Sequence, residues 1–363
     1  MSVSSLSRFE PTDVWYTVCP VPSAISIALG RGELQKSFDN SGARLSNVRR
    51  HPDRDVREAH YDQTQQNLFR EGGNIPPLWS RSLGRDVRLI GLTWVEHYAA
   101  LVALPGSGIR TPGDLGGKRL GLVNRPNDRI DFTRATQLRG YLTALRAGNV
   151  SRDSVSFVDI TYDKPLVALP PEQQALSSSA FGIVGVRERQ GVLLRALLEG
   201  TVDALYLTGS GAEIQALAAA GIVWDAATAL DPSDRVSNLT PVAFTVKGEL
   251  LDSQPDIVTA YVAANLRSAR WARANPQEAA RYIARDTAIQ EEAVGLSYSP
   301  TVAQQLETSL DPALIGHLET QKRFLLEEGF IPNDFSFDDF IAPEPLRRAR
   351  LIVDAEADQR LSA

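Results

Sequence analysis

Residues 15–32 read WYTVCPVPSAISIALGRG, and this stretch sets the expected fold class of the chain. An apolar run ends at Cys19, Pro20 and Pro22 suit the start of a helix, and apolar side chains then repeat at helical spacing. A short strand that leads directly into a helix is the basic unit of α/β folds with mainly parallel sheets.

The same alternation of strand and helix patterns continues along the chain. Short apolar runs typical of strands occur at residues 14–18, 88–92, 101–104, 119–123, 155–160, 203–207 and 242–246. Helical stripes are formed by Leu138, Tyr141, Leu142 and Leu145, and by Val258, Tyr261, Val262, Leu266 and Ala269. We therefore predict an α/β protein in which helices pack one face on a sheet.

The length of 363 residues favours two domains over a single core. A passage rich in Pro and Gly at residues 105–118 follows a predicted strand and suits a domain crossing, and a second crossing is expected between residues 226 and 239. These crossings predict one lobe built from residues 1–104 plus 239–363, with residues 105–238 as an inserted lobe.

Composition and charge exclude several kinds of partner. The chain has 38 Lys+Arg against 44 Asp+Glu, a net charge of −6, which argues against binding to nucleic acid or to an anionic membrane. The N-terminal residues 1–18 lack the apolar run of about 7 to 15 residues that a signal peptide needs, and no later window has about 18 uncharged apolar residues. We expect a cytoplasmic protein that acts as a monomer.

The cysteine and histidine content limits metal and redox sites. Cys19 is the only cysteine, so neither an intramolecular disulfide nor a C-x-x-C site can form. The four histidines, His51, His60, His97 and His317, show no H-E-x-x-H spacing and give little support for zinc. Of these, His97 precedes the first crossing and is open between a structural role and an approach to the space between the lobes.

Cys19 stands where the predicted strand meets the predicted helix. The unpaired N–H groups and the macrodipole of a helix N-terminus stabilise a thiolate, so a reactive thiol fits this position. Free cysteine is also among the most buried residue types and often serves as a small apolar side chain. Placement alone leaves both interpretations open.

Residues 59–79, AHYDQTQQNLFREGGNIPPLW, group His60, Arg70, Gly72 and Gly73. An arginine fork beside a Gly-Gly turn combines charge-assisted hydrogen bonds with exposed backbone N–H groups, which suits a small oxyanion. A Gly-Gly pair is more often only a turn, and a lone histidine is more often a structural hydrogen-bonding group. The basic residues 44–57 nearby include Asp53 and Asp55, and we expect a solvated loop there.

Taken together, these segments resemble the hydroxybiphenyl sulfinate desulfinase family of bacterial dibenzothiophene desulfurisation. That family shows a C-P-V-P segment, a His ten residues before an Arg, and an R-x-G-G-x-I-P-P-L segment, which residues 19–22, His60 and residues 70–78 match. Weaker likeness at residues 114–119, 200–206, 271–273 and 321–326 also fits the wider sulfonate and nitrate solute-binding superfamily.

The resemblance implies a fold and an activity. The fold is that of type II periplasmic binding proteins, with two lobes that are each a mixed sheet flanked by helices and an active-site cleft between them. The implied activity is a hydrolytic carbon–sulfur bond cleavage that releases sulfite from an aromatic sulfinate. It implies neither a metal nor an organic cofactor.

The resemblance also implies roles for individual residues. Cys19 is the catalytic thiol, and His60 is its partner or a group that hydrogen-bonds the substrate. Arg70 and the N–H of Gly73, with Gly72 beside them, form the sulfinate anchor. Tyr61 follows His60 where an aromatic side chain is expected in contact with the substrate ring.

Two departures from the family pattern bear on substrate binding. Glu71 stands beside Arg70 and would weaken its hold on an anion if the two side chains paired. Residues 124–134, NRPNDRIDFTR, do not match the apolar aryl-binding residues of the family. The aryl group therefore stays open between hydroxybiphenyl and a smaller or more polar ring.

The main alternative function is a non-catalytic solute-binding protein or sensor for a sulfonate or sulfinate anion. Such a protein uses the same cleft and requires no thiol. A third class, resembling the fungal thiamine-pyrimidine synthases, carries a motif with several cysteines, which a chain with one cysteine cannot supply. The joint presence of Cys19, His60 and the segment from Arg70 to Gly73 favours the desulfinase.

Overall fold

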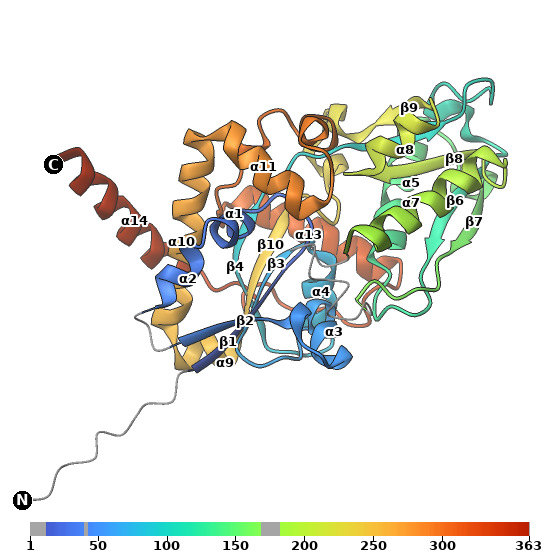
Figure 1. The fold of residues 1–363 in the computed structure, drawn as a ribbon. Helices are drawn as coiled ribbons and strands as arrows, with labels where there is room; N and C mark the ends of the chain where they lie inside the picture. Colours follow the sequence, from blue (N-terminus) through green and yellow to red (C-terminus); the bar gives the residue numbers. More distant parts are fainter. Residues whose placement is uncertain (1–11, 40–42, 168–181, 363) are drawn as a thin grey trace, which may run out of the picture.

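The computed structural model describes residues 12–39, 43–167 and 182–362, which form two five-stranded sheets. The strand order is β2-β1-β3-β10-β4 in the first sheet and β7-β6-β8-β5-β9 in the second. We call each sheet with the helices packed on it a lobe; Figure 1 shows the first lobe at the left and centre and the second at the right.

The strands are β1 (Thr12–Val18), β2 (Ala43–Asn47), β3 (Leu68–Gly72), β4 (Val87–Thr93), β5 (Ala99–Ala103), β6 (Arg119–Asn124), β7 (Ser156–Thr161), β8 (Ala204–Thr208), β9 (Gly221–Asp225) and β10 (Val242–Lys247). The helices are α1 (Ala24–Gly30), α2 (Glu33–Phe38), α3 (Arg54–Asp62), α4 (Ile75–Ser82), α5 (Phe132–Ala147), α7 (Gly182–Leu198), α8 (Gly211–Leu217), α9 (Gly248–Ser253), α10 (Pro255–Ala274), α11 (Pro276–Thr287), α12 (Val294–Ser297), α13 (Pro312–Glu327) and α14 (Glu344–Ser362). Short 3-10 turns are η1 (Val48–Arg50), η2 (Pro112–Leu115), η3 (Arg152–Ser154), η4 (Ala226–Thr228), η5 (Pro232–Arg235), η6 (Glu291–Ala293) and η7 (Val302–Gln304).

Both sheets are mixed in the same way. In the first, β1 runs parallel to β2 and β3, while β10 is antiparallel to β3 and β4. In the second, β6 runs parallel to β7 and β8, while β5 is antiparallel to β8 and β9. Each antiparallel strand is formed by chain that has just crossed from the other sheet, because β5 follows β4 and β10 follows β9. The predicted α/β class, with mixed sheets flanked by helices, is confirmed.

The seven predicted strands are all present, with ends within two residues of the prediction. The prediction omits β2, β3 and β9. β3 reads LFREG, and all five residues are buried although two are charged, so neither alternation nor an apolar run marks it. A strand covered on both faces shows no period of two, and internal charges hide it further.

The prediction of a solvated loop at residues 44–57 is wrong. This stretch forms most of β2, η1 and the start of α3, and Arg49 and Arg57 are only 3% and 5% exposed. Arg57 is buried because its guanidinium donates to backbone carbonyls, including His51 O at 2.8 Å and Val167 O at 3.2 Å. A long arginine side chain can therefore be buried when carbonyl oxygens satisfy its donors.

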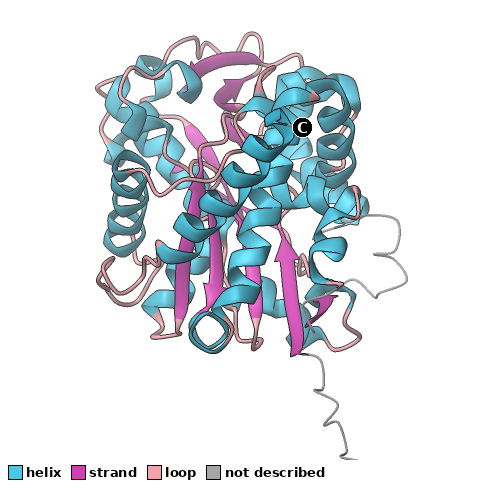
Figure 2. Ribbon diagram, turned by 90° about the vertical axis from the view of Figure 1, so that its left-hand side faces the viewer, coloured by secondary structure: helices cyan, strands magenta, loops and turns pink. Residues whose placement is uncertain are grey.

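Helix α10 packs on the first sheet. Tyr261, on the stripe predicted from sequence, stacks on Phe69 of β3 with ring centroids 3.9 Å apart, and it also contacts Phe244 of β10. Figure 2, which looks onto the first lobe, shows helices lying across its strands. This packing fixes β3, and therefore Arg70, against its neighbours.

One apolar core links the two lobes. It contains Leu89 of β4, Leu101 of β5, Leu120 of β6 and residues of α13, so it draws on both sheets. At the C-terminal end of α13, Glu328 forms an ion pair with Arg152 of the second lobe at 2.8 Å. The lobes therefore share a packed boundary in addition to the two crossings of the chain.

The strand pairing can be compared with the predicted boundaries of the two lobes. Strand β5 lies within residues 1–104, the range predicted for the first lobe, but it pairs in the second sheet. The division into residues 1–104 plus 239–363 and residues 105–238 stays a prediction.

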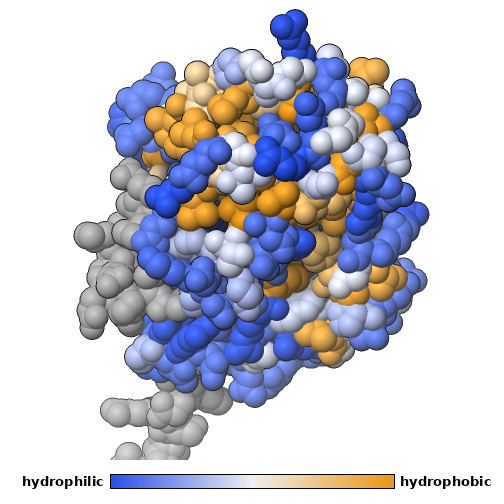
Figure 3. Space-filling model, turned by 90° about the vertical axis from the view of Figure 1, so that its right-hand side faces the viewer, coloured by the Kyte–Doolittle hydropathy of each residue, from blue (hydrophilic) through white to orange (hydrophobic). Residues whose placement is uncertain are grey.

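The outer face of the second lobe is mostly hydrophilic, with patches of apolar side chains between polar ones (Figure 3). Exposed apolar side chains are normal on protein surfaces, since apolar atoms supply more than half of the accessible area. Over the described ranges, no helix has the length and hydropathy needed to cross a membrane. Residues 1–11, on which the expected compartment partly rests, lie outside the described residues.

Candidate active site

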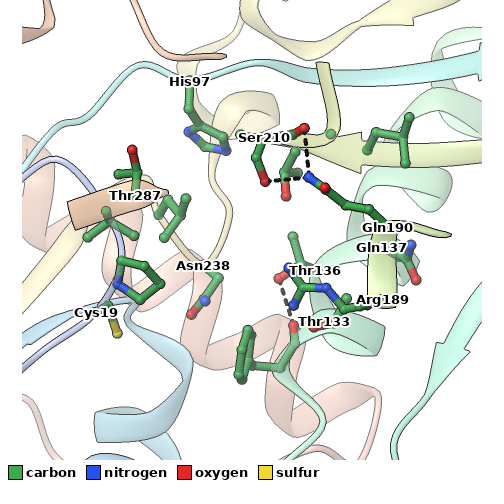
Figure 4. Close-up of a pocket in the computed structure, with 18 of the residues that line it drawn as sticks. Cys19, His97, Thr133, Thr136, Gln137, Arg189, Gln190, Ser210, Asn238 and Thr287 are labelled. Atoms are coloured by element: carbon green, nitrogen blue, oxygen red, sulfur yellow. Dashed lines mark hydrogen bonds between the residues drawn. The ribbon is translucent and has the colours of Figure 1, made fainter. Parts of the chain in front are cut away.

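A pocket with a volume of about 140 Å³ lies between the two lobes. The first lobe contributes Cys19 after β1, His60 and Tyr61 on α3, and Arg70 on β3. The second contributes the start of α5, the middle of α7 and the turn that follows β8 (Figure 4). No Asp or Glu belongs to the wall formed by described residues, whereas Arg70 and Arg189 both do. The pocket is therefore electrostatically suited to an anion.

The thiol of Cys19 is placed by the pairing of β1 with β3. The backbone N–H of Cys19 donates to Glu71 O at 2.9 Å, which continues the ladder beyond Val18. The sulfur atom then lies 3.3 Å from His60 Nε2 and accepts a hydrogen bond from Arg70 Nη2 at 3.4 Å. The structure thus brings together Cys19, His60 and Arg70, three of the six site residues predicted from the sequence.

The N-terminus of α1 is capped by Ser23, four residues after Cys19. Helix α1 begins at Ala24, and the hydroxyl of its N-cap Ser23 accepts from Ser26 N. Burial raises the pKa of Glu71 to about 7, while the hydrogen bond from Asn265 opposes that rise. The first turn of α1 therefore has its own side-chain cap, and the thiol is flanked by His60 and Arg70 instead.

His60 is held from both sides of its ring. Thr17 Oγ1 lies 2.7 Å from Nδ1, and the Tyr61 ring packs edge-on with centroids 5.0 Å apart. Burial, followed by the charges of Arg70 and Arg49, lowers the pKa of His60 well below its usual value. The imidazole is therefore neutral near pH 7, and Nε2 can accept or donate a proton at sulfur according to its tautomer.

Arg70 is 1% exposed, and its guanidinium is fixed by backbone carbonyls. Nε donates to His60 O and Nη1 donates to Gly73 O, both at 2.8 Å. Burial lowers the pKa of Arg70, while the nearby Cys19 raises it. The two carbonyls orient the fork without neutralising it, so its positive charge acts on the thiol and on any anion beside it.

The pairing of Arg70 with Glu71 that the sequence left open does not occur. Glu71 Oε1 accepts from Asn265 Nδ2 at 3.1 Å, and the amide oxygen of Asn265 accepts from Thr308. Adjacent residues of a strand point to opposite faces of the sheet, which separates the two side chains. Glu71 therefore leaves the Arg70 fork available to an anion.

Gly72 and Gly73 act by being small. A Cβ at Gly72 would overlap the sulfur of Cys19, and a Cβ at Gly73 would overlap the side-chain amide of Asn238. Gly73 also supplies the carbonyl that holds Arg70. Its role as an N–H donor to the substrate stays a prediction.

The aromatic wall of the pocket joins both lobes. Tyr61 packs on Phe132 with centroids 5.9 Å apart, and the Arg125 guanidinium lies 4.7 Å above the Phe132 ring. Phe132 and Thr133 belong to residues 124–134, in which no aryl-binding residue was identified from sequence. An aromatic residue directly after Asp131, the N-cap of α5, is the signal that was available there.

His97 lines the pocket but is engaged in the crossing segments. Its Nδ1 lies 3.0 Å from Thr240 Oγ1, and its Nε2 lies 3.3 Å from Ser237 Oγ. Burial lowers the pKa of His97 to about 4, so the ring is neutral. These contacts assign His97 a structural role between the two crossings.

The chain resembles known proteins in its three-dimensional structure. No protein-family model and no curated protein sequence matches the chain. Within the described residues, no cluster of three or more His, Cys, Asp or Glu side chains is arranged to hold a metal ion.

Several solved structures match over almost the whole chain. The desulfurization enzyme DszB matches with a TM-score of 0.73 and 26% identity, covering 94% of this chain and 99% of that chain. A Cys-to-Ser variant of DszB in complex with biphenyl-2-sulfinic acid matches with a TM-score of 0.71, 26% identity and the same coverage. The sulfonate-binding protein SsuA from Methylobacillus flagellatus matches with a TM-score of 0.69 and 16% identity, covering 95% of this chain and 96% of that chain. The chain therefore has the type II periplasmic-binding-protein fold, and among these structures its sequence is most similar to that of the desulfurization enzyme DszB.

Proposed function

We propose that the protein is an aryl-sulfinate desulfinase, a hydrolase that cleaves the carbon–sulfur bond of an aromatic sulfinate and releases sulfite. The observation that carries this proposal is the position of Cys19 Sγ in the pocket wall, between His60 Nε2 at 3.3 Å and Arg70 Nη2 at 3.4 Å. Similarity to DszB at 26% identity across 94% of the chain supports it.

The pocket offers separate surfaces for the two parts of such a substrate. The Arg70 fork provides positive charge for the sulfinate oxygens beside the thiol. Tyr61 and Phe132 provide ring faces for the aryl group. A cavity of about 150 Å³ can hold benzene, so about 140 Å³ suffices for one aromatic ring.

Two reaction routes begin from these groups. In the first, the Cys19 thiolate attacks the sulfinate sulfur, an S–S bond forms, the C–S bond breaks, and the aryl carbon takes the thiol proton by way of His60. Water then attacks the S-linked sulfur, which releases sulfite and returns the proton to Cys19. No oxidant or reductant is needed, because the cysteine sulfur is oxidised on S–S formation and reduced again on hydrolysis.

In the second route, the Cys19 thiol protonates the ring carbon that bears sulfur, and the C–S bond breaks as sulfur dioxide departs. Water converts sulfur dioxide to sulfite, and the proton released restores the thiol. The hydrogen bond from Arg70 to Sγ favours the first route, because a guanidinium stabilises a thiolate more than a thiol.

The proposal is tested by sulfite release from a panel of aryl sulfinates, with Cys19→Ser alongside the unmodified protein. We expect turnover that the variant lacks. Because Cys19 is the only cysteine, iodoacetamide reports on that thiol alone, and a bound sulfinate should slow its alkylation. Absence of sulfite from every substrate tested would refute the proposal.

The alternative is a sulfonate- or sulfinate-binding protein without catalytic activity. The match to SsuA supports the fold that such proteins use, but at 16% identity it supports nothing finer. Aryl sulfonates that raise the melting temperature of both Cys19→Ser and the unmodified protein, without sulfite release from sulfinates, would favour this function.

A further inference from the structure

The wall opposite the thiol carries a second arginine that the desulfinase mechanism does not use. Arg189 lies on α7 in the second lobe, and Figure 4 shows its side chain reaching into the pocket on the side away from Cys19. The helix is tied at this level to the turn after β8, because Gln190 Nε2 donates to Ser210 O at 3.1 Å and to Ser210 Oγ at 3.0 Å. Arg189 therefore lies on a helix that hydrogen bonds hold to the turn after β8.

The charge of Arg189 has no hydrogen-bonded counterion in the part of the chain that the structure describes. The neighbouring Arg125 differs in this respect, because it pairs with the buried Asp128, whereas Arg70 donates to two neutral backbone carbonyls. Burial, and then the nearby Arg125, lower the pKa of Arg189 to about 10, so it remains protonated at neutral pH. A partly buried cation whose charge is not paired by a described carboxylate is stabilised by an anion that reaches it.

Between the two arginines lies the aromatic part of the wall. Tyr61 and Phe132 contact each other across the lobes, while Leu193 of α7 and Tyr206 of β8 also line the pocket. An aryl ring held there has its sulfinate at Cys19 and Arg70 and its opposite edge toward α7. Among the described residues, no Asp or Glu lines the pocket, and Asp131, whose charge raises the pKa of Arg189, lies outside its wall.

We propose that Arg189 binds a second anionic group on the substrate, so that the pocket selects aryl sulfinates whose ring also carries a carboxylate or a similar anion away from the sulfinate. This inference rests on the proposed function for its reacting end, but its recognition step can be tested separately. The structure places one arginine charge on each side of a pocket whose wall includes the rings of Tyr61 and Phe132. An aryl sulfinate whose ring carries no other charged group would use only one of the two arginines.

The kinetic test compares benzenesulfinate with 4-carboxybenzenesulfinate in three proteins: unmodified, Arg189→Gln and Arg195→Gln. Arg195 is the matched control, because it lies on the same helix but is exposed and does not line the pocket. We expect the unmodified protein and Arg195→Gln to prefer the carboxylated substrate in kcat/KM by about 30-fold, the effect of one charge-assisted hydrogen bond. In Arg189→Gln most of that preference should be lost.

Two kinetic results would overturn the inference. One is the absence of a preference in the unmodified protein. The other is a fall in kcat/KM by the same factor for both substrates in Arg189→Gln, which would place Arg189 at the sulfinate or in the scaffold.

Calorimetry with unreactive sulfonates separates this inference from the proposed function. If no protein releases sulfite, tighter binding of 4-sulfobenzoate than of benzenesulfonate, lost in Arg189→Gln and kept in Arg195→Gln, would support the second anion site while the desulfinase proposal fails. Equal binding of the two sulfonates, or no binding of either, would overturn the second anion site as well.

Discussion

His60 Nε2 lies 3.3 Å from the sulfur of Cys19, although the two residues are 41 positions apart in the sequence. The contact depends on two elements, because β1 ends at Val18 and α3 carries His60 in its last turn. Arg70 closes the arrangement, since its Nε holds the carbonyl of His60 and its Nη2 holds the sulfur. One buried guanidinium therefore positions both the thiol and its partner.

Replacing His60 by Gln should slow sulfite release by about 100-fold or more, because Gln keeps hydrogen-bonding groups near the thiol but cannot transfer its proton. The measurement is kcat on the best sulfinate of the panel. His317→Gln is the control, since His317 lies on α13 beside Trp94 and does not line the pocket. A rate in His60→Gln equal to that of the control would exclude proton transfer by His60.

The pH profile should carry no inflection from His60 near neutral pH. Burial, Arg70 and Arg49 lower its pKa well below 6.5, so the imidazole stays neutral between about pH 6.5 and 8. The profile of kcat/KM over this range should therefore have the same shape for the unmodified protein and for His60→Gln. An acid limb near pH 6.5 that the variant abolishes would contradict the pKa direction.

Thr17 should act as a positioning residue for His60. Its hydroxyl lies 2.7 Å from Nδ1 and both side chains are buried, so Thr17→Val removes a hydrogen bond that orients the ring while keeping its volume. We expect kcat to fall by about 10-fold with little change in KM, the loss of one buried hydrogen bond of about 1.4 kcal/mol. Thr17→Ser should restore most of the rate, and a Ser variant as slow as Val would point to packing instead.

Adding one methyl group at Gly72 should disable the thiol. A Cβ there would overlap Cys19 Sγ, and relief of that overlap displaces sulfur from His60 and Arg70. Gly72→Ala should lower the free energy of unfolding by about 1–3 kcal/mol and abolish turnover. Gly316→Ala is the control: Gly316 lies on α13 with no atom near its added Cβ, and the change should stabilise the helix by up to about 1 kcal/mol. An active Gly72→Ala would show that sulfur position is not critical.

Glu71 should make the protein less stable as pH rises. Its pKa is raised to about 7 in the folded chain, so between about pH 4.5 and 7 the folded state holds a proton that the unfolded state has lost. Relative to Glu71→Gln, the unmodified protein should lose about 3 kcal/mol of unfolding free energy across this window and then level off. Urea titrations at several pH values measure the difference.

The pH dependence of stability that Glu71 contributes can be separated from that of other groups. Comparison with Glu71→Gln cancels the contributions of His60 and His97, whose pKa values are lowered and act in the opposite direction. Glu319→Gln on α13 controls for the loss of an exposed carboxylate. A constant difference between Glu71→Gln and the unmodified protein from pH 4.5 to 8 would show that Glu71 is already ionised in the folded state.

The fold was predictable where the spacing of apolar residues matches the period of the helix or strand that they form. The stripe of α10, for example, carries Val258, Tyr261 and Val262 on one face, and all three are buried as predicted. Strand β3 was not predictable in this way, because LFREG places Arg70 and Glu71 in a strand that is buried on both faces. Glu71 accepts a hydrogen bond from Asn265, which is distant in the sequence, and Arg70 donates to backbone carbonyls, so local side-chain patterns do not reveal how either charge is accommodated.

The candidate site shows the same division. Cys19, His60 and Arg70 were identifiable because they lie in short motifs of the first lobe, and the structure brings them into contact. Arg189 and Phe132 were not identified, because they reach the pocket only through the docking of the second lobe. The steric role of Gly72 could not be predicted either, because it depends on how close the sulfur of Cys19 lies in the folded chain.

Strand β10 joins the first sheet only after the chain has crossed back from the second, and this order has a consequence for synthesis of the chain. Strand β3, which carries Arg70, has β1 on one side and β10 on the other, and β10 follows every strand of the second sheet in the sequence. Domains fold as the ribosome releases them, beginning at the N-terminus. The edge of β3 therefore stays open until the inserted lobe has emerged, so the thiol and its arginine are assembled late, and a nascent chain that ends before residue 242 should lack the completed pocket.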